Sequence, residues 1–292
     1  MRSKGQGARL KGNPRPAGRF LPLAQCSLPL GFSLIELIVV MLVVGILAAI
    51  VAMFIRSPLE GYLAASRRAA LVDAADTALL RMTRDVRLAL PNSLRVSQSG
   101  GATYLEFLPL QDGGRYRAAR TGGGGGDILD FTSGADASFD VLGPPVNATA
   151  GQYLVIYNLG LDTATSAWLG GNRRTVTSSG SVGNLAFTAT GAPLPLESPG
   201  SRFYLTGAPV TYVCDPVGHE LRRVTGYALQ ATQPTTFTGA ASRLLARHVN
   251  ACAIDYDPGA SQRLGQLTLR LQLGQDGETV TLYREVPVNN DA

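Results

Sequence analysis

The sequence predicts an α+β protein in which a long N-terminal helix packs on a predominantly antiparallel β domain. Three observations support this fold class. Residues 32–55 form an almost uninterrupted apolar run, residues 59–90 repeat apolar side chains at spacings of three and four, and short strand-like runs follow from residue 93 onward. We therefore expect a transmembrane helix half, an amphipathic helix half and a β-rich domain, in that order.

Residues 1–31 form a basic segment without hydrophobic periodicity, which we interpret as a leader that need not fold. The leader contains no Asp or Glu, and its cations are Arg2, Lys4, Arg9, Lys11, Arg15 and Arg19. The rest of the chain is nearly neutral, so its charge predicts no nucleic-acid partner. A basic flank before an apolar helix predicts that the leader lies in the cytoplasm.

The apolar run from Phe32 to Ile55 is long enough for a helix to cross the ~30 Å hydrocarbon core of a bilayer, at about 1.5 Å of rise per residue. Ser33 and Glu36 are its only polar residues. A carboxylate in hydrocarbon finds neither water nor a counter-charge, so Glu36 is a candidate functional residue that needs a partner. A cut between Gly31 and Phe32 would create such a partner, a free terminal amine.

Two simpler interpretations compete for this run. A conventional signal peptide has an apolar core of about 7–15 residues before its cleavage site, and this core is longer, although Ala48, Ala49 and Ala52 form a loose site. A plain signal anchor fits the length but does not explain why Glu36 is tolerated.

The residues Gly31-Phe32-Ser33-Leu34-Ile35-Glu36, followed by this apolar helix, resemble the processing signal of type IV prepilins and type II secretion pseudopilins. In that family a membrane aspartyl peptidase cuts after the glycine and N-methylates the new terminal Phe. The resemblance implies cleavage between Gly31 and Phe32, and pairing of Glu36 with the terminal amine of a neighbouring subunit during assembly. It also implies a pilin-like fold, with the second half of the helix packed on a sheet.

Later segments resemble the MshO-type branch of this family, whose members are minor pilin-like proteins for biogenesis of the mannose-sensitive haemagglutinin pilus. These segments are residues 90–96, 105–109, 214–227, 245–252 and 286–290. The resemblance implies four partners: prepilin peptidase, other pilins or minor pilins, an inner-membrane assembly platform and membrane lipid. Two alternatives remain, a minor pseudopilin of a type II secretion system and a signal-anchored periplasmic enzyme or binding domain.

After the apolar run, Pro58 lacks an amide hydrogen and predicts a kink or a restart of the helix. The apolar stripe that follows consists of Ala65, Ala69, Val72, Ala75, Leu79, Met82, Val86 and Leu90. Charged residues mostly occupy the other faces, so we expect the stripe to dock onto the β domain. Pro91-Asn92 predicts the end of the helix.

The remaining sequence predicts strands in two blocks. The first block contains residues 94–96, 104–108, 128–131, 139–141, 153–158, 174–176 and 185–188, and the second contains residues 203–205, 210–214, 221–229, 251–256, 267–273 and 279–286. In residues 267–273 leucines alternate with Thr268, Arg270 and Gln272, which predicts one buried face against the amphipathic helix. Asp276-Gly277 predicts a hairpin turn.

Two of the three cysteines form a candidate disulfide. Cys26 lies in the leader, whereas Cys214 and Cys252 lie in a segment that we expect outside the cytoplasm, where disulfides form. A metal site is the competing interpretation, but only His219 and His248 are near and no CxxC motif occurs. We expect the disulfide and no metal.

The chain contains no sequence motif that predicts catalysis. No G-x-S-x-G motif occurs, and neither His219 nor His248 has an obvious nucleophile in the sequence. Asp255 and Asp257 are a weak candidate for a calcium loop, because the EF-hand pattern is missing and a plain turn explains them. We expect no enzymatic activity, no catalytic residue and no cofactor.

These interpretations divide the chain into four parts: a cleaved leader (1–31), a transmembrane helix (32–55), an amphipathic helix extension (56–90) and a periplasmic β-rich domain (91–292). The expected location is the bacterial inner membrane with a single pass. The family resemblance implies a place at the tip or base of a pilus after assembly.

Overall fold

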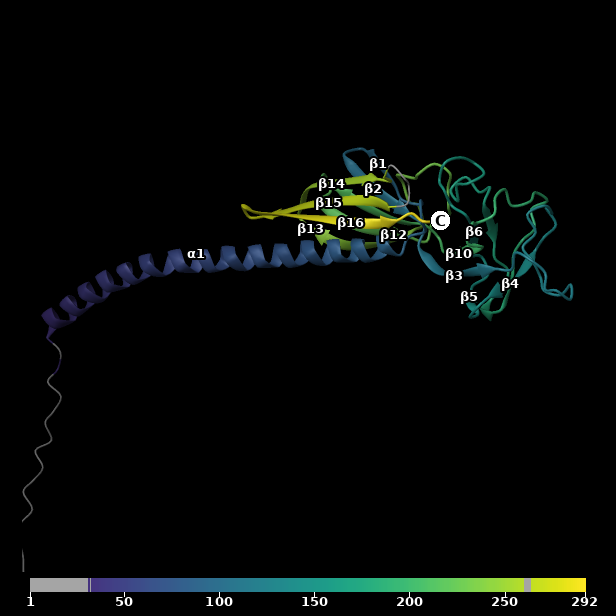
Figure 1. Cartoon of the computed structure of the whole chain (residues 1–292). Helices are drawn as coiled ribbons and strands as arrows, with labels where there is room; N and C mark the ends of the chain where they lie inside the picture. Colours follow the sequence, from purple (N-terminus) through teal and green to yellow (C-terminus); the bar gives the residue numbers. More distant parts are fainter. Residues whose placement is uncertain (1–30, 32, 260–263) are drawn as a thin grey trace, which may run out of the picture. The chain divides into compact units, whose positions relative to one another are not determined.

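The computed structural model describes residues 31, 33–259 and 264–292 (Figure 1). Most of the expected leader, including Cys26, lies outside the described residues, as does Phe32. The chain divides into two compact units, Met1–Pro58 and Leu59–Ala292, and we describe each by itself.

A single long helix, α1 (Leu34–Arg87), begins in the first unit and ends in the second. It begins at Leu34 because Ser33 is its N-cap: the Ser33 hydroxyl accepts a hydrogen bond from the backbone N–H of Glu36 at 3.2 Å. Pro58 lies inside this helix. Of the two alternatives predicted at Pro58, a kink or a restart, the restart is wrong, because the loss of one backbone donor is local and the helix continues on both sides.

The helix ends earlier than the apolar stripe predicts. It stops at Arg87, and the backbone N–H of Leu90 donates instead to the carbonyl of Leu108 at 2.8 Å. Ala89 forms an isolated antiparallel bridge with Pro109. Leu90 still fills the interior, but it does so from the segment that connects the helix to the sheets.

The second unit contains two β lobes in which every described strand pairing is antiparallel. We call the first the helix lobe, because the last part of α1 packs in it. Its five-stranded sheet has the order β1 (Arg95–Ser99), β2 (Ala102–Phe107), β11 (Val210–Asp215), β12 (Glu220–Thr225), β13 (Ala241–Arg247), and its three-stranded sheet has the order β14 (Val249–Asp257), β15 (Leu264–Gln275), β16 (Glu278–Asn289).

The second lobe, which we call the six-stranded lobe, is an insertion between β2 and β11. Its sheet has the order β7 (Arg173–Thr175), β6 (Tyr153–Ile156), β10 (Arg202–Thr206), β3 (Leu110–Tyr116), β4 (Ser138–Leu142), β9 (Asn184–Ala186), and a two-stranded sheet pairs β5 (Val146–Ala148) with β8 (Gly180–Val182). Phe107 and Val210, the residues on either side of the insertion, face each other directly in the helix lobe.

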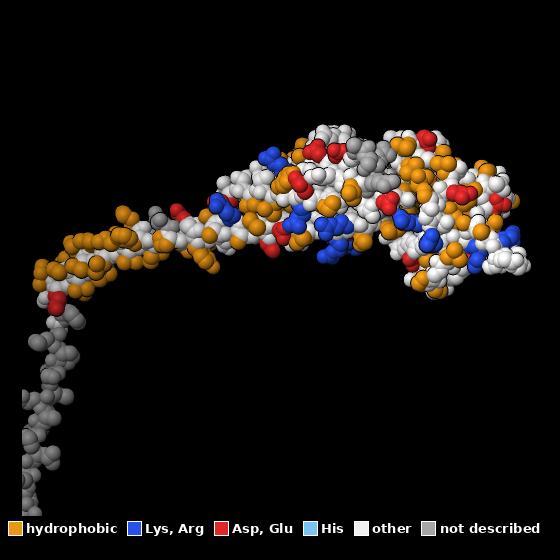
Figure 2. Space-filling view, viewed as in Figure 1, with side chains coloured by type: hydrophobic (Ala, Val, Ile, Leu, Met, Phe, Trp, Pro, Cys, Tyr) orange, Lys and Arg blue, Asp and Glu red, His pale blue; other side chains and the backbone are white. Residues whose placement is uncertain are grey.

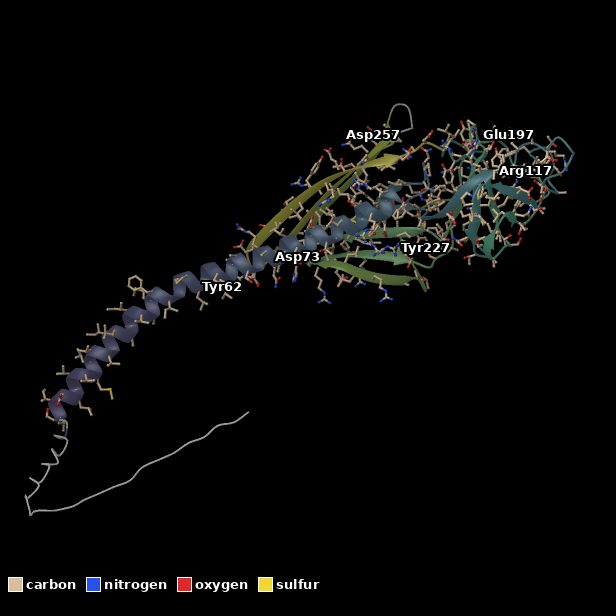
Figure 3. The ribbon with its side chains drawn as sticks, turned by 60° about the horizontal axis from the view of Figure 1, so that its bottom comes forward. Tyr62, Asp73, Arg117, Glu197, Tyr227 and Asp257 are labelled. Atoms are coloured by element: carbon tan, nitrogen blue, oxygen red, sulfur yellow. A yellow bond between two sulfur atoms is a disulfide. The ribbon has the colours of Figure 1, made fainter. Side chains whose placement is uncertain are left out.

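The core of the helix lobe joins the helix to both of its sheets. Leu79 and Met82 of α1 are almost completely buried in the same cluster as Leu267, Leu269 and Leu271 of β15. The predicted burial of the leucine face against the amphipathic helix is therefore confirmed. Figure 3 shows the last part of α1 between the yellow strands of the three-stranded sheet and the green strands of the five-stranded sheet.

The six-stranded lobe has its own core, centred on aromatic side chains. Phe139 and Phe203 are fully buried with their ring centroids 5.1 Å apart, and Tyr116 packs on Phe139. A smaller cluster that includes Leu90, Leu108 and Trp168 lies between the two lobes. The observed architecture is thus an apolar N-terminal helix followed by a predominantly antiparallel β domain.

The strand predictions were incomplete. Residues 128–131 form no strand, and Leu129 instead fills the core of the six-stranded lobe with a single backbone hydrogen bond to Arg117. The strands β3, β5, β8 and β13 were not predicted. The Asp276-Gly277 turn between β15 and β16 is confirmed, since both residues adopt the left-handed conformation that favours this dipeptide.

Candidate functional site

The first part of α1 presents a long apolar surface to its surroundings. Every described side chain from Leu34 to Ile55 is exposed, and Leu34 itself is 78% exposed (Figure 2). By length and composition α1 can cross a membrane, and no other helix of the described residues can. A continuous apolar surface of this extent requires a lipid or protein environment, because water disfavours its exposure.

Glu36 lies in the first turn of this apolar helix. Ser33 and Glu36 have the S-x-x-E spacing of a capping box, in which a carboxylate near the positive end of the helix dipole adds about 0.3–1 kcal/mol. Among the described residues, no Lys or Arg forms an ion pair with the Glu36 carboxylate. The capping role of Ser33 was not predicted from the sequence, although the S-x-x-E spacing signals it.

Gly31 directly precedes the segment that we expect to remain after cleavage. It is exposed, and no heavy atom lies within 4 Å of the position that a Cβ would occupy. The geometry of the predicted cleavage bond itself lies outside the described residues, because Phe32 is not among them.

The predicted disulfide joins the two sheets of the helix lobe. Cys214 on β11 and Cys252 on β14 are bonded with an S–S distance of 2.02 Å, across a sequence separation of 38. Both cysteines border the core that contains Leu79 and Met82. The disulfide thus holds the five-stranded and three-stranded sheets together beside the helix.

Asp85 anchors the helix to the five-stranded sheet. Its carboxylate accepts hydrogen bonds from the Tyr212 hydroxyl and from Nε of Arg223, both at 2.8 Å, and forms an ion pair with Arg81 at 3.1 Å. Burial, reinforced by the Asp85 carboxylate, raises the pKa of Tyr212. On the other sheet, Arg284 donates to Asp76 at 2.7 Å. These ionic contacts fix how the helix docks.

A buried ionic network that was not predicted from the sequence lies on β1 and β2. Arg95 and Glu106 face each other across the two strands, with Nε 2.6 Å from a carboxylate oxygen of Glu106. The Tyr227 hydroxyl donates to Glu106 at 2.8 Å, and the Arg95 guanidinium lies 3.7 Å from the Trp168 ring centroid. Burial raises the pKa of Glu106 although Arg95 and Tyr227 oppose the shift.

This network has a structural role, because each of its charges contacts other groups of the protein. Arg95 also donates to the carbonyls of Gln230 and Ala231, which attaches the loop after β12 to the sheet. The available signal in the sequence was a pair of opposite charges in adjacent predicted strands. Only the register, which places Arg95 opposite Glu106, identifies them as partners.

The two histidines lie in turns of the helix lobe. His219 ends the turn between β11 and β12, and its Nδ1 lies 3.0 Å from the carbonyl oxygen of Val249. His248 connects β13 and β14, and both histidines have a positive φ. Asp257 accepts a hydrogen bond from the backbone N–H of Gly259 at 2.8 Å, as in a plain turn.

The described residues contain no group of three or more His, Cys, Asp or Glu that is arranged to hold a metal ion. No family model, curated protein or solved structure matches this chain. The features that bear on function are therefore the apolar helix, the residues at its start and the fold that follows it.

Proposed function

We propose that this chain is a prepilin-like protein, a minor pilin or pseudopilin of the MshO type. The observation that carries the proposal is the first part of α1, an exposed apolar helix that begins directly after Gly31-Phe32-Ser33 and bears Glu36 in its first turn. The continuation of the same helix into the core of an antiparallel β domain supports it further.

In this proposal, prepilin peptidase cuts between Gly31 and Phe32 and N-methylates Phe32. Before assembly, the cut chain lies in the bacterial inner membrane with its β domain in the periplasm. The basic leader supports a cytoplasmic N-terminus under the positive-inside rule. The Cys214–Cys252 disulfide supports an oxidising location for the β domain.

Assembly then depends on a charge pair between Glu36 and the terminal amine of a neighbouring subunit. Lys4 and Lys11 are the only lysines of the chain, and both precede Gly31. A chain cut after Gly31 therefore has one ammonium group, at its N-terminus. Pairing it with Glu36 in hydrocarbon compensates two buried charges and fixes the axial register of neighbouring helices.

The six-stranded lobe supports a minor role for this subunit. It adds a second β lobe, with its own core, to the helix lobe. A shaft would have to accommodate this lobe on every subunit, whereas an initiating or capping subunit places it only once. We propose that the partners are prepilin peptidase, other pilins and an inner-membrane assembly platform.

The N-terminus of the native protein tests this proposal. We expect N-terminal sequencing and intact mass to show N-methylated Phe32 in cells with prepilin peptidase, and an uncut chain in cells without it. An amine-reactive reagent gives a matched readout, since it should label only the N-terminus of the cut chain. An uncut chain in both strains, or a cut after Ala52, would overturn the proposal and leave the apolar run as an anchor.

A further inference from the structure

An open cavity of about 440 Å³ lies on the six-stranded lobe, at the edge that β7 forms. Two adjacent arginines and two threonines provide its polar walls, and alanine and proline provide the apolar ones. The lining residues are Thr163, Ala164, Gly170, Gly171, Arg173, Arg174, Thr190, Ala192, Pro193 and Pro195. A volume of this size is typical of sites for small molecules.

Arg174 is a buried cation that no described carboxylate neutralises. Arg174 is 6% exposed. Within the described part of the chain, its guanidinium donates to backbone carbonyls alone, those of Gly171 at 3.1 Å, Arg173 at 2.8 Å and Ala192 at 2.8 Å. Burial lowers its pKa. Carbonyls satisfy donors but carry no net charge, so the site retains an uncompensated positive charge.

Two acids that border a small cavity together with Arg174 make their hydrogen bonds to other groups. Asp130 and Asp136 border a small cavity of about 10 Å³ that Arg174 also lines, but neither forms an ion pair with it. Asp136 accepts a hydrogen bond from the backbone N–H of Asp130 at 2.8 Å, and Asp130 accepts two from Thr132.

Arg173 adds a second cation to the same cavity. Its Nη1 donates to the carbonyl of Ala167 at 2.7 Å, and its guanidinium lies 4.9 Å from the Tyr153 ring centroid. Burial lowers the pKa of Arg173 as well, and it too has no carboxylate partner among the described residues. Two guanidinium groups thus line one cavity, and no carboxylate of residues 33–259 or 264–292 pairs with either of them.

The loop that forms one wall of the cavity is tightly held. Asn158 accepts a hydrogen bond from the backbone N–H of Ala167, and Asn172 donates to Asn158 and to the carbonyl of Thr165. A Cβ at Gly171 would lie 2.1 Å from the carbonyl oxygen of Thr163, so only glycine allows this close approach. Such a wall is formed before any ligand arrives, which lowers the entropy cost of binding.

We propose that this cavity binds a small molecule through an oxyanion group, a carboxylate or a sulfate. A planar guanidinium offers paired donors that match the oxygens of such a group, and the two arginines supply the positive charge. Pro193, Pro195 and Ala164 provide an apolar wall for the body of the ligand. This inference is independent of the membrane segment and of the proposed assembly role.

The test is isothermal titration calorimetry of the full chain in detergent micelles with D-glucuronate, inorganic sulfate and D-glucose. We expect saturable binding of both anions and none of glucose. Arg173→Gln should weaken glucuronate binding roughly tenfold or more, since it removes a charged hydrogen-bond donor. Thr163→Phe should do the same by filling the cavity while it keeps both arginines. Arg120→Gln, an equal loss of charge outside the cavity, should have no effect.

Three results would overturn the proposal: no saturable anion binding by the unmodified chain, equal binding of glucose, or unchanged binding by Arg173→Gln and Thr163→Phe. Arg174→Gln tests the buried cation, with circular dichroism to check that the variant folds. If it does not fold, the other two variants decide. Tighter binding of glucuronate than of sulfate would support an organic acid as the ligand, and equal binding of the two would support a free inorganic anion as the ligand.

Discussion

The ionic contacts of Asp85 lead to a quantitative prediction about helix docking. In Asp85→Ala the Tyr212 hydroxyl, which is fully buried, loses its acceptor at a cost of about 1–3 kcal/mol. The ion pair with Arg223 is partly exposed and should add about 0.5–1 kcal/mol, and the exposed i,i+4 pair with Arg81 about 0.3–0.5 kcal/mol. We therefore expect a total loss of about 2–4.5 kcal/mol in the free energy of unfolding.

Urea unfolding of the full chain in detergent, followed by the fluorescence of Trp168, measures this loss, because Trp168 is the chain's only tryptophan and is buried between the lobes. Asp73→Ala is the matched control, an exposed aspartate on the same helix, and it should change stability by less than about 0.5 kcal/mol. If Asp85→Ala lost no more than this control, or if a double-mutant cycle with Tyr212→Phe showed no coupling, the docking role of Asp85 would be wrong.

Three further predictions concern assembly, the disulfide and pH. Glu36→Ala should be processed normally yet fail to enter filaments. Glu36→Gln should fail as well, although glutamine preserves a capping box, so immunoblots of purified pili that show it at wild-type stoichiometry would refute the charge pair. Replacing both Cys214 and Cys252 by serine should cost about 2–4 kcal/mol in urea unfolding, and a reductant should then have no further effect. Burial raises the pKa of Tyr212 and Tyr227 above the ordinary value of 10.0, so the unfolded chain ionises first as the pH rises beyond 10. The stabilisation that depends on the two neutral hydroxyls is therefore fully present below pH 10, and the free energy of unfolding should fall as the pH rises above it. Alkaline titration of Tyr227→Phe should show a smaller fall, and an unchanged curve would contradict this assignment.

Local sequence patterns predicted those elements that bury one face, because the buried side chains repeat with the period of the helix or strand. The leucine alternation of β15 and the second half of the apolar stripe of α1, from Ala75 to Val86, both repeat with the period of the element that carries them, so each pattern indicated which side is buried. The first half of the stripe was predicted wrongly, because Ala65, Ala69 and Val72 are exposed and do not dock onto the β domain. The Cys214–Cys252 disulfide followed from the number of cysteines and the expected compartment. Cleavage after Gly31 and the pairing of Glu36 remain predictions.

The strand β3 shows why other elements were missed. Its sequence contains Asp112, Gly113 and Gly114, which are typical of a turn. In the structure, a Cβ at Gly113 would lie 2.9 Å from the carbonyl oxygen of Phe203, and one at Gly114 would lie 3.1 Å from the Phe203 ring. These glycines therefore allow a neighbouring strand and its aromatic core residue to approach, a long-range requirement that no local pattern contains.

The charged residues of the ionic network and of the cavity are also brought together by long-range contacts. Arg95 and Glu106 become partners through strand register, and Arg173 and Arg174 become neighbours of Pro193 only when the loop before β10 closes the cavity. A sequence pattern shows that these residues are charged, but it does not show which charges lack a partner. That information requires the tertiary structure.

The insertion of the six-stranded lobe makes the β domain modular. Because Phe107 and Val210 face each other in the ladder and the N–H of Gly207 donates to the carbonyl of Pro109, the inserted residues leave and re-enter the helix lobe at neighbouring points. Such an insertion resembles an enlarged hairpin loop, a position where proteins tolerate the insertion or replacement of a segment. Natural variation or design can therefore replace the lobe, and with it the cavity, while the helix, the disulfide and the first sheet keep the same connections.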